Sequence, residues 1–254
     1  MVRCAVSAHE PLLINILTLL LSPSTDVLGP GSIVDCGAHT GGEACLYANT
    51  APNRTVHAVE PWSRNHGQLR QLSKALPNLK LLHAGLGSSE RTVSLHGTHS
   101  ASMLTHVEKR PPVAQGTPAS FTIYRLDSLF ADGGPWARER LAFGHFDVEG
   151  AELDLLQGAT MVMRRDRPIY TVEATLRDVK GVKALLQQVE SLGFRAFMVP
   201  ERCGGDRQCR NFICSPVERQ LMGWLPAEMN NVLVEASSFN SSALMSVPVA
   251  RPSK

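Results

Sequence analysis

Hydrophobic residues in the middle of the chain alternate between short apolar runs and longer stretches with one apolar face. The short runs are rich in Val, Ile, Leu and Phe, which is typical of buried strands. The predicted strands are residues 32–36, 55–60, 79–84, 143–148 and 168–173. The clearest predicted helices between them are residues 42–50, 65–76 and 179–192. This alternation predicts βαβ units with right-handed crossovers, and therefore an α/β fold with a mainly parallel sheet and helices on both faces.

The end of this pattern differs from its middle. Residues 194–199 and 210–214 are both strand-like, and a short loop separates them, which predicts a closing antiparallel pair. We therefore expect a seven-stranded sheet within a single domain over residues 31–223. Residues 1–30 are expected to form a helical segment that packs on the core, and residues 224–254 a Ser-rich tail.

Two segments lie outside the regular pattern. The apolar run at residues 12–21 is too short to cross a bilayer, which takes about 20 apolar residues. We expect a packed helix, no membrane span and a cytoplasmic location, with the core of a secretory signal as the alternative. Residues 97–118 contain Pro111, Pro112 and Pro118 and predict a long irregular segment. Such a segment is either a lid over a substrate or a surface loop.

Composition narrows the class of protein. With 254 residues, 43% hydrophobic and 19% charged, the chain suits one large globular domain. A net charge of +2 gives no reason to expect a nucleic-acid partner. None of the six cysteines forms a C-x-x-C pair, which argues against a zinc or thioredoxin-like site. Cys36 and Cys45 are expected to be free buried thiols, whereas Cys203 and Cys209 flank a loop and could bond in an oxidising compartment.

A glycine-rich turn follows the first predicted strand. Asp35 ends that strand, and Gly37 and Gly41 follow in the pattern D-x-G-x-x-x-G, which differs from the dinucleotide pattern G-x-G-x-x-G. Glu60 ends the second predicted strand, where a carboxylate can accept the hydroxyls of a ribose. Glycines let the backbone approach a ligand, and the helix that follows offers free N–H groups. Together these residues favour S-adenosylmethionine over a nicotinamide cofactor.

Three stretches carry a family resemblance. Residues 34–41, 59–61 and 146–152 together resemble the FkbM family of S-adenosylmethionine-dependent methyltransferases, and the sequence D-V-E-G-A-E from Asp147 to Glu152 is the most specific of them. The resemblance extends over about residues 30–215. It implies a class I methyltransferase Rossmann-like fold and transfer of a methyl group to a hydroxyl, often on a sugar or polyketide.

Further cofactor contacts follow from the same arrangement. His39 is expected to contribute its backbone, and Trp62 either covers the adenosine or packs as a surface indole. Gly85 and Leu86 are expected in a turn that either borders the adenine or is a plain turn. The predicted cofactor-binding residues are Asp35, Gly37, Ala38, His39, Gly41, Glu60, Pro61, Trp62, Gly85 and Leu86.

Acidic residues follow the fourth predicted strand. Asp147 and Glu149 are the predicted catalytic residues, because a hydroxyl is a poor nucleophile until a base takes its proton. The alternative for both is capping of the turn and the helix that follows. His145 and Glu173 are further candidate bases at the same sheet edge. Paired carboxylates could instead hold a divalent cation, but the sequence has no complete ligand set, and we predict no metal site.

The predicted function is S-adenosylmethionine-dependent O-methylation of a small-molecule or carbohydrate acceptor. Two alternatives stay open, a non-catalytic nucleoside-binding protein of the same fold and a nicotinamide-dependent oxidoreductase. The sequence specifies neither the acceptor, whose pocket is built from variable loops, nor the oligomeric state.

Overall fold

The structure, a computed structural model, describes residues 2–6, 10–25, 27–95, 119–203, 208–226, 229 and 231–244. The predicted lid or loop at residues 97–118 lies outside the described residues. The helices are α1 (Pro11–Leu21), α2 (Gly42–Thr50), α3 (His66–Ala75), α4 (Leu126–Phe130), α5 (Glu152–Gln157), α6 (Thr160–Asp166), α7 (Val179–Ser191) and α9 (Ser241–Leu244), with 3-10 turns η1 (Ser63–Asn65) and η3 (Leu221–Gly223). The strands are β1 (Ser32–Cys36), β2 (Val56–Val59), β3 (Leu79–Leu82), β4 (Ala84–Leu86), β5 (Arg91–Leu95), β6 (Ala119–Tyr124), β7 (Leu141–Phe146), β8 (Ile169–Thr175), β9 (Phe194–Met198), β10 (Cys209–Pro216) and β11 (Val234–Ala236).

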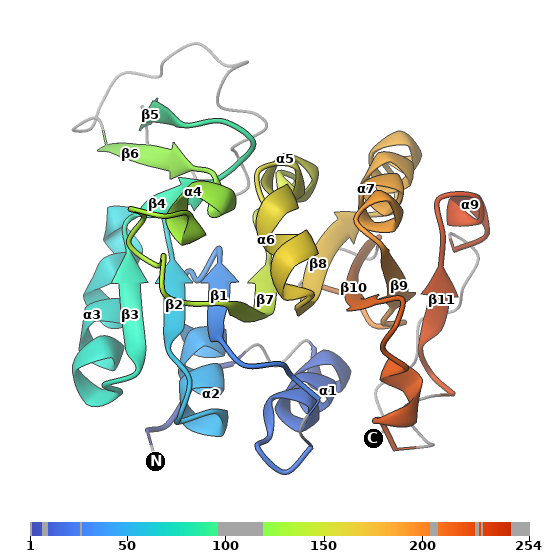
Figure 1. The fold of residues 1–254 in the computed structure, drawn as a ribbon, viewed down its shortest axis with the longest axis horizontal. Helices are drawn as coiled ribbons and strands as arrows, with labels where there is room; N and C mark the ends of the chain where they lie inside the picture. The colour runs from blue at the N-terminus through green and yellow to red at the C-terminus, as the bar shows by residue number, and fades with distance from the viewer. Residues whose placement is uncertain are drawn as a thin grey trace.

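The main sheet has the strand order β11-β9-β10-β8-β7-β1-β2-β3 (Figure 1). The five neighbouring strands β8, β7, β1, β2 and β3 pair in parallel, whereas β10 is antiparallel to both β8 and β9. The predicted parallel sheet and closing antiparallel pair are therefore confirmed. The predicted strand count of seven is one too low, because β11 pairs with β9. That strand lies within the residues predicted as a tail, and its three residues are too few to show a strand pattern.

A second, three-stranded sheet lies above β2 and β3 in Figure 1, in the order β4-β6-β5. Gly85 and Leu86 belong to β4, which pairs with β6, so the predicted turn at these residues is wrong. The chain leaves the main sheet after Leu82 and enters the small sheet at Ala84. Sequence pattern could not show this change of sheet, because both strands are short and apolar.

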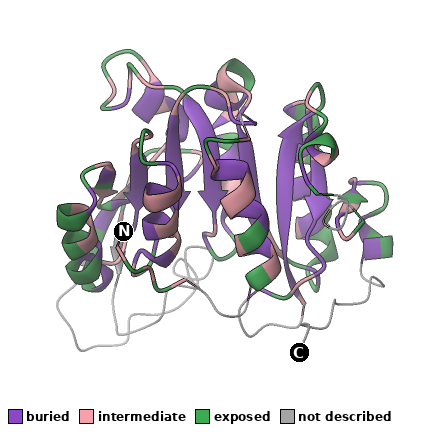
Figure 2. Cartoon of the chain, turned by 90° about the horizontal axis from the view of Figure 1, so that it is seen from below, coloured by how far each residue is buried: buried purple, intermediate pink, exposed green. Residues whose placement is uncertain are grey.

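Helices cover both faces of the main sheet, and the strands are buried between them (Figure 2). One core cluster joins α4, α5, α6, α7 and α9 to the sheet, and the other joins α1, α2 and α3 to its opposite face. Helix α1 lies in the segment predicted to be helical, and it buries Leu13, Ile16, Leu17 and Leu20. In the described part of the chain, no helix has the length and apolar character that crossing a membrane requires.

Two disulfides link described cysteines. Cys203 bonds to Cys209, the pair that the sequence suggested for an oxidising compartment. Cys4 bonds to Cys45, so the prediction of a free thiol at Cys45 is wrong, whereas Cys36 is free and buried as expected. Cys4 and Cys45 are 41 residues apart in the sequence, and only the folding of the N-terminal segment onto α2 brings them together.

Candidate functional site

The sheet face covered by α1 and α2 becomes polar at its carboxyl edge. Strand side chains alternate between the two faces, so polar residues in register on neighbouring strands share one face. Asp35 on β1 pairs in register with His145 on β7, which pairs with Thr171 on β8. Two residues further along β8, Glu173 lies opposite Asn211 of β10. This polar row stands where ligands bind in open α/β sheets.

Asp35 is the most buried acid in the row, with 1% of its surface exposed. Its carboxylate accepts a hydrogen bond from the N–H of Ala44 in the first turn of α2. Its Oδ2 atom has no hydrogen-bond partner among the described residues. Burial, followed by the charges of Glu43 and Asp147, raises the pKa of Asp35 well above its ordinary value. A buried, unpartnered carboxylate oxygen is costly, so a cationic or hydrogen-donating ligand would relieve a real penalty here.

The glycines of the turn after β1 make room for protein. Gly37 has φ 87°, and a Cβ there would collide with the carbonyl oxygen of Asp147. Gly41 has φ 88° and precedes α2, and its Cβ would lie 2.6 Å from Leu69 Cδ2 and 2.8 Å from Leu72 Cδ1. We expected these glycines to let the backbone approach a ligand, and the structure gives a further reason for them. They let the turn close against the loop after β7 and against α3.

Glu60 connects the two loops that the sequence assigned to the cofactor. Its Oε2 accepts the backbone N–H of His39 at 2.8 Å, in the turn after β1. Its Oε1 accepts the N–H of Trp62 at 2.8 Å and the amide of Asn65 at 3.1 Å. Glu60 is 2% exposed, and His39 has φ 46° with an exposed side chain. The Glu60 carboxylate therefore fixes both loops. The sequence predicted that this same carboxylate accepts the hydroxyls of a ribose.

The remaining predicted cofactor residues surround these loops. Ala38 is buried, and its N–H donates to Val59 at 3.2 Å. The Pro61 carbonyl accepts from His83 Nε2 at 2.9 Å. The half-buried Trp62 packs against Phe121 and Ile123 of the small sheet. Gly85 and Leu86 are buried in β4, and the Leu86 side chain packs in the core.

The turn after β7 is built by Glu152. Its Oε1 accepts the N–H groups of Val148 and Gly150, each at 3.1 Å. Glu149 and Gly150 both have positive φ, and Glu149 is exposed. The turn-capping role that was the alternative for Asp147 and Glu149 is therefore filled by Glu152. Burial raises the pKa of Glu152 to about 7, partly offset by these hydrogen bonds.

Asp147 and Glu173 form the acidic centre of the site. Burial raises the pKa of Asp147 to about 8, and the charges of Glu149 and Glu152 add to this effect. Burial, followed by the charge of Asp147, raises the pKa of Glu173 to about 9. The Oδ1 atom of Asp147 is buried without a hydrogen-bond partner in the described structure. Carboxyl groups that hold protons near neutral pH in a cluster are typical of functional sites.

His145 is held in place from two sides. Its Nδ1 lies 2.7 Å from the hydroxyl of Thr171, and its ring packs edge-on against Tyr47 of α2. Burial lowers the pKa of His145, so the neutral ring is favoured. The Tyr47 hydroxyl is buried without a hydrogen-bond partner among the described residues. His145 is thus a neutral, oriented side chain beside the acids.

Sequence reasoning missed several members of this cluster. Glu43 in α2 and Glu10 before α1 both raise the pKa of Asp147 through their charge. Tyr47, Thr171 and Asn211 lie on elements that the sequence identified only as core. Glu10 is 137 positions from Asp147 in the sequence, so no local pattern links them. The polar residues at same-face strand positions were the available signal.

One group of described side chains is spaced closely enough to suit a metal ion. In the described ranges, the group that could hold an ion is Glu173 with Cys203 and Cys209. The two cysteines are bonded to each other, and a disulfide sulfur is a poor ligand compared with a thiolate.

Comparison with known proteins gives a family and a fold. A family model described as the methyltransferase FkbM domain matches residues 35–196. No curated protein matches the chain in sequence. The solved structure of methyltransferase FkbM from Methylobacillus flagellatus KT has a TM-score of 0.51 and 15% identity to this chain. The alignment covers 77% of this chain and 47% of that one, so the chain spans about half the length of that protein.

Two further solved structures are similar over most of the chain. One is a putative methyltransferase from Streptococcus mutans in complex with S-adenosylhomocysteine, with a TM-score of 0.46 and 12% identity, covering 83% of this chain and 99% of that one. The other is an rRNA methylase from Streptococcus thermophilus, with a TM-score of 0.46 and 14% identity, covering 84% of this chain and 100% of that one.

The family match includes Asp35, Glu60, Asp147 and Glu173, the acids that the fold brings to one sheet edge. The likeness of the Methylobacillus structure is one of fold, and it agrees with the predicted Rossmann-like class I methyltransferase arrangement. Because the family model covers more than half of its residues, the chain belongs to the FkbM methyltransferase family.

Proposed function

We propose that the protein is an S-adenosylmethionine-dependent methyltransferase that acts on a hydroxyl of a small-molecule or carbohydrate acceptor. The observation that carries the proposal is the pair of buried, unpartnered carboxylate oxygens on Asp35 and Asp147, at the carboxyl edge of the sheet. S-adenosylmethionine carries a sulfonium and an ammonium group, and either would stabilise the ionised form of these carboxyl groups, which burial disfavours. The residues present therefore fit the cofactor.

Each residue has a task in this proposal. Glu60 holds the backbone of both ligand loops and offers the remaining lone pair of Oε2 to a ribose hydroxyl. Asp35 would hold the cationic part of the cofactor, which supplies an electrophilic methyl group when bound. The acceptor hydroxyl must lie in line with that group, and holding it there provides much of the rate.

Asp147 is the proposed base, with Glu149 beside it. A carboxyl with a pKa of about 8 is a stronger base than an ordinary aspartate and still ionises near neutral pH. The Asp147 carboxylate would take the proton that the hydroxyl of the methyl acceptor gives up. Glu173, with a pKa of about 9, stays protonated at neutral pH and can donate a hydrogen bond to the acceptor.

The two disulfides bear on location. Disulfides persist in oxidising compartments and are rare in the cytosol. Cys4–Cys45 and Cys203–Cys209 therefore favour an oxidising compartment over the cytoplasmic location expected from the sequence, while residues 12–21 lie in the packed helix α1 and do not behave as the core of a cleaved signal.

Calorimetry on the purified, oxidised protein tests the cofactor. We expect S-adenosylhomocysteine to bind and NAD to leave no signal. Binding of NAD without S-adenosylhomocysteine would support the oxidoreductase alternative and refute the proposal.

Asp147→Asn and Glu149→Gln test the chemistry, because both keep the side-chain size and remove the charge. At least one should lower turnover by about 10²–10⁴-fold while the affinity for S-adenosylhomocysteine is retained.

A further inference from the structure

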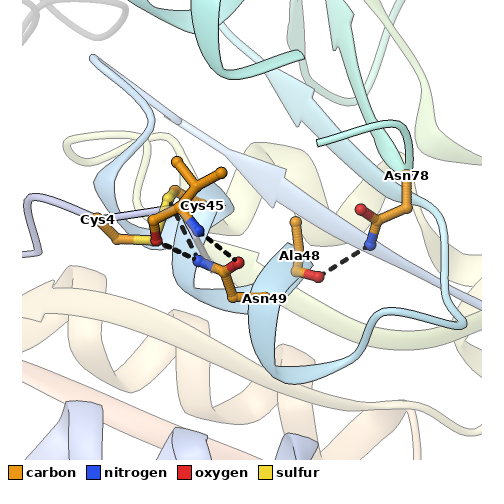
Figure 3. Close-up of a disulfide and its surroundings, with 6 residues drawn as sticks. Cys4, Cys45, Ala48, Asn49 and Asn78 are labelled. Atoms are coloured by element: carbon orange, nitrogen blue, oxygen red, sulfur yellow. Dashed lines mark hydrogen bonds between the residues drawn. A yellow bond between two sulfur atoms is a disulfide. The ribbon is translucent and has the colours of Figure 1, made fainter. Parts of the chain in front are cut away.

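The N-terminal residues that the structure describes, Val2–Val6 and Glu10, lie against the site, and we refer to them as the strap. Cys4 is bonded to Cys45 of α2 (Figure 3). Beside this bond, the Asn49 side chain pairs with the strap backbone, donating to the Val2 carbonyl at 2.7 Å and accepting the Val2 N–H at 3.4 Å. The strap is thus attached along α2, the helix whose first turn faces the acidic cluster.

The strap reaches the beginning of α2 at Gly42. A Cβ at Gly42 would collide with the carbonyl oxygen of Ala5 and lie 3.4 Å from the Cα of Val6. Gly42 lies in the helix, where alanine is the better residue, so the close approach of the strap explains the glycine. The backbone of Ala5 therefore packs directly on the turn that the proposed cofactor uses.

Glu10 lies at the opposite side of the acidic cluster. Its Oε1 accepts a hydrogen bond from the amide of Asn211 at 3.2 Å, and its charge acts on both Asp147 and Glu173. The beginning of α1 is held nearby, because Glu201 accepts the N–H groups of Leu12 and Leu13, each at 3.0 Å. Ala5 and Glu10 thus bound the cluster on the α2 side and on the β10 side.

We propose that the strap forms one wall of the ligand site and that the Cys4–Cys45 disulfide holds this wall in place. The inference rests on the cofactor proposed above. Ala5 is exposed and Val6 is only half-buried, so few apolar contacts hold these two residues in place once the Cys4–Cys45 bond is broken. Reduction should therefore loosen the wall, and S-adenosylhomocysteine should leave faster.

The disulfide and the ligand site are then thermodynamically coupled. If breaking the bond weakens ligand affinity by some factor, ligand binding must favour the disulfide over the dithiol by the same factor. The Cys203–Cys209 bond lies at the other end of the acidic cluster, beside Glu173, and is not the bond that attaches the strap to α2. It provides a matched control.

The experiment measures the affinity and dissociation rate of S-adenosylhomocysteine for the full chain, oxidised and reduced. We expect reduction to weaken affinity by about five- to tenfold, mostly through faster dissociation. Cys4→Ser should show the weaker affinity already when oxidised and should not respond to reductant. Cys203→Ser should bind as the wild type does and keep its response. Mass spectrometry after alkylation reports which cysteines are bonded in each sample.

Gly42→Ala tests the wall without touching either cysteine. It should push Ala5 away and reproduce the faster dissociation while the Cys4–Cys45 bond stays intact. In glutathione buffers, S-adenosylhomocysteine should shift the Cys4–Cys45 pair toward the disulfide and leave Cys203–Cys209 unchanged.

The outcomes separate the two proposals. If S-adenosylhomocysteine binds equally well to the oxidised, reduced and Cys4→Ser proteins, the wall is wrong and the cofactor assignment stands. If it binds none of them, the proposed function itself fails.

Discussion

Asp147→Asn should stabilise the protein, and by more at pH 7 than at pH 5. In the unfolded chain this carboxyl ionises near its ordinary pKa of 3.8, whereas in the folded protein it ionises near 8. Between these two pH values, the folded state keeps a proton that the unfolded state has lost. The free energy of unfolding therefore falls as the pH rises through this window, and it is level below and above it. Asparagine cannot ionise, so it removes this loss.

The magnitude follows from the width of the window. One proton costs about 1.4 kcal/mol per pH unit, so the gain from Asp147→Asn should grow by about 3 kcal/mol between pH 5 and pH 7. This gain in stability is smaller if the neighbouring carboxyl of Glu173 or Glu152 holds the proton in place of Asp147. A gain in stability with loss of turnover would mark a carboxyl kept for function at a cost to the fold.

Urea denaturation at the two pH values measures the effect. The control is Asp132→Asn, the same change at an exposed carboxyl, which should stay within about 0.5 kcal/mol of the wild type at both pH values. The reasoning fails if Asp147→Asn is destabilising at pH 7, or if its effect is the same at pH 5. Either result would mean that the carboxylate is well paired in the folded protein.

Three further predictions concern the ligand loops and the second disulfide. Glu60→Ala should weaken S-adenosylhomocysteine affinity by about 1–3 kcal/mol in calorimetry, since two loops lose a charged hydrogen-bond acceptor; unchanged affinity would place the ribose elsewhere. Gly41→Val should lower the melting temperature as well as the affinity, because a β-branched residue at φ 88° is strained and its side chain meets Leu69; a fully stable variant would contradict this packing. Cys203→Ser should retain turnover, and an inactive but folded variant would show that the bond to Cys209 serves catalysis.

Much of the arrangement could be predicted from local sequence. The parallel character of the sheet, the closing antiparallel pair and a helix at residues 12–21 follow from apolar periodicity, which depends on near neighbours in the chain. The motif after Asp35 and the D-V-E-G-A-E turn indicated the family. These two motifs follow parallel strands, and parallel strands place their carboxyl ends at one edge of the sheet, so the motifs had to lie close together.

The tertiary structure decided the rest, because it depends on residues far apart in the sequence. Only the fold shows that Cys4 reaches Cys45 and that Glu10 joins Asp147 and Glu173. It also shows that Gly41 and Gly37 accommodate protein atoms, which no spacing rule distinguishes from room for a ligand. The sequence by itself thus determined the class of fold and the edge of the sheet that bears the acids. Burial set the protonation of those acids, and burial exists only once the chain has packed.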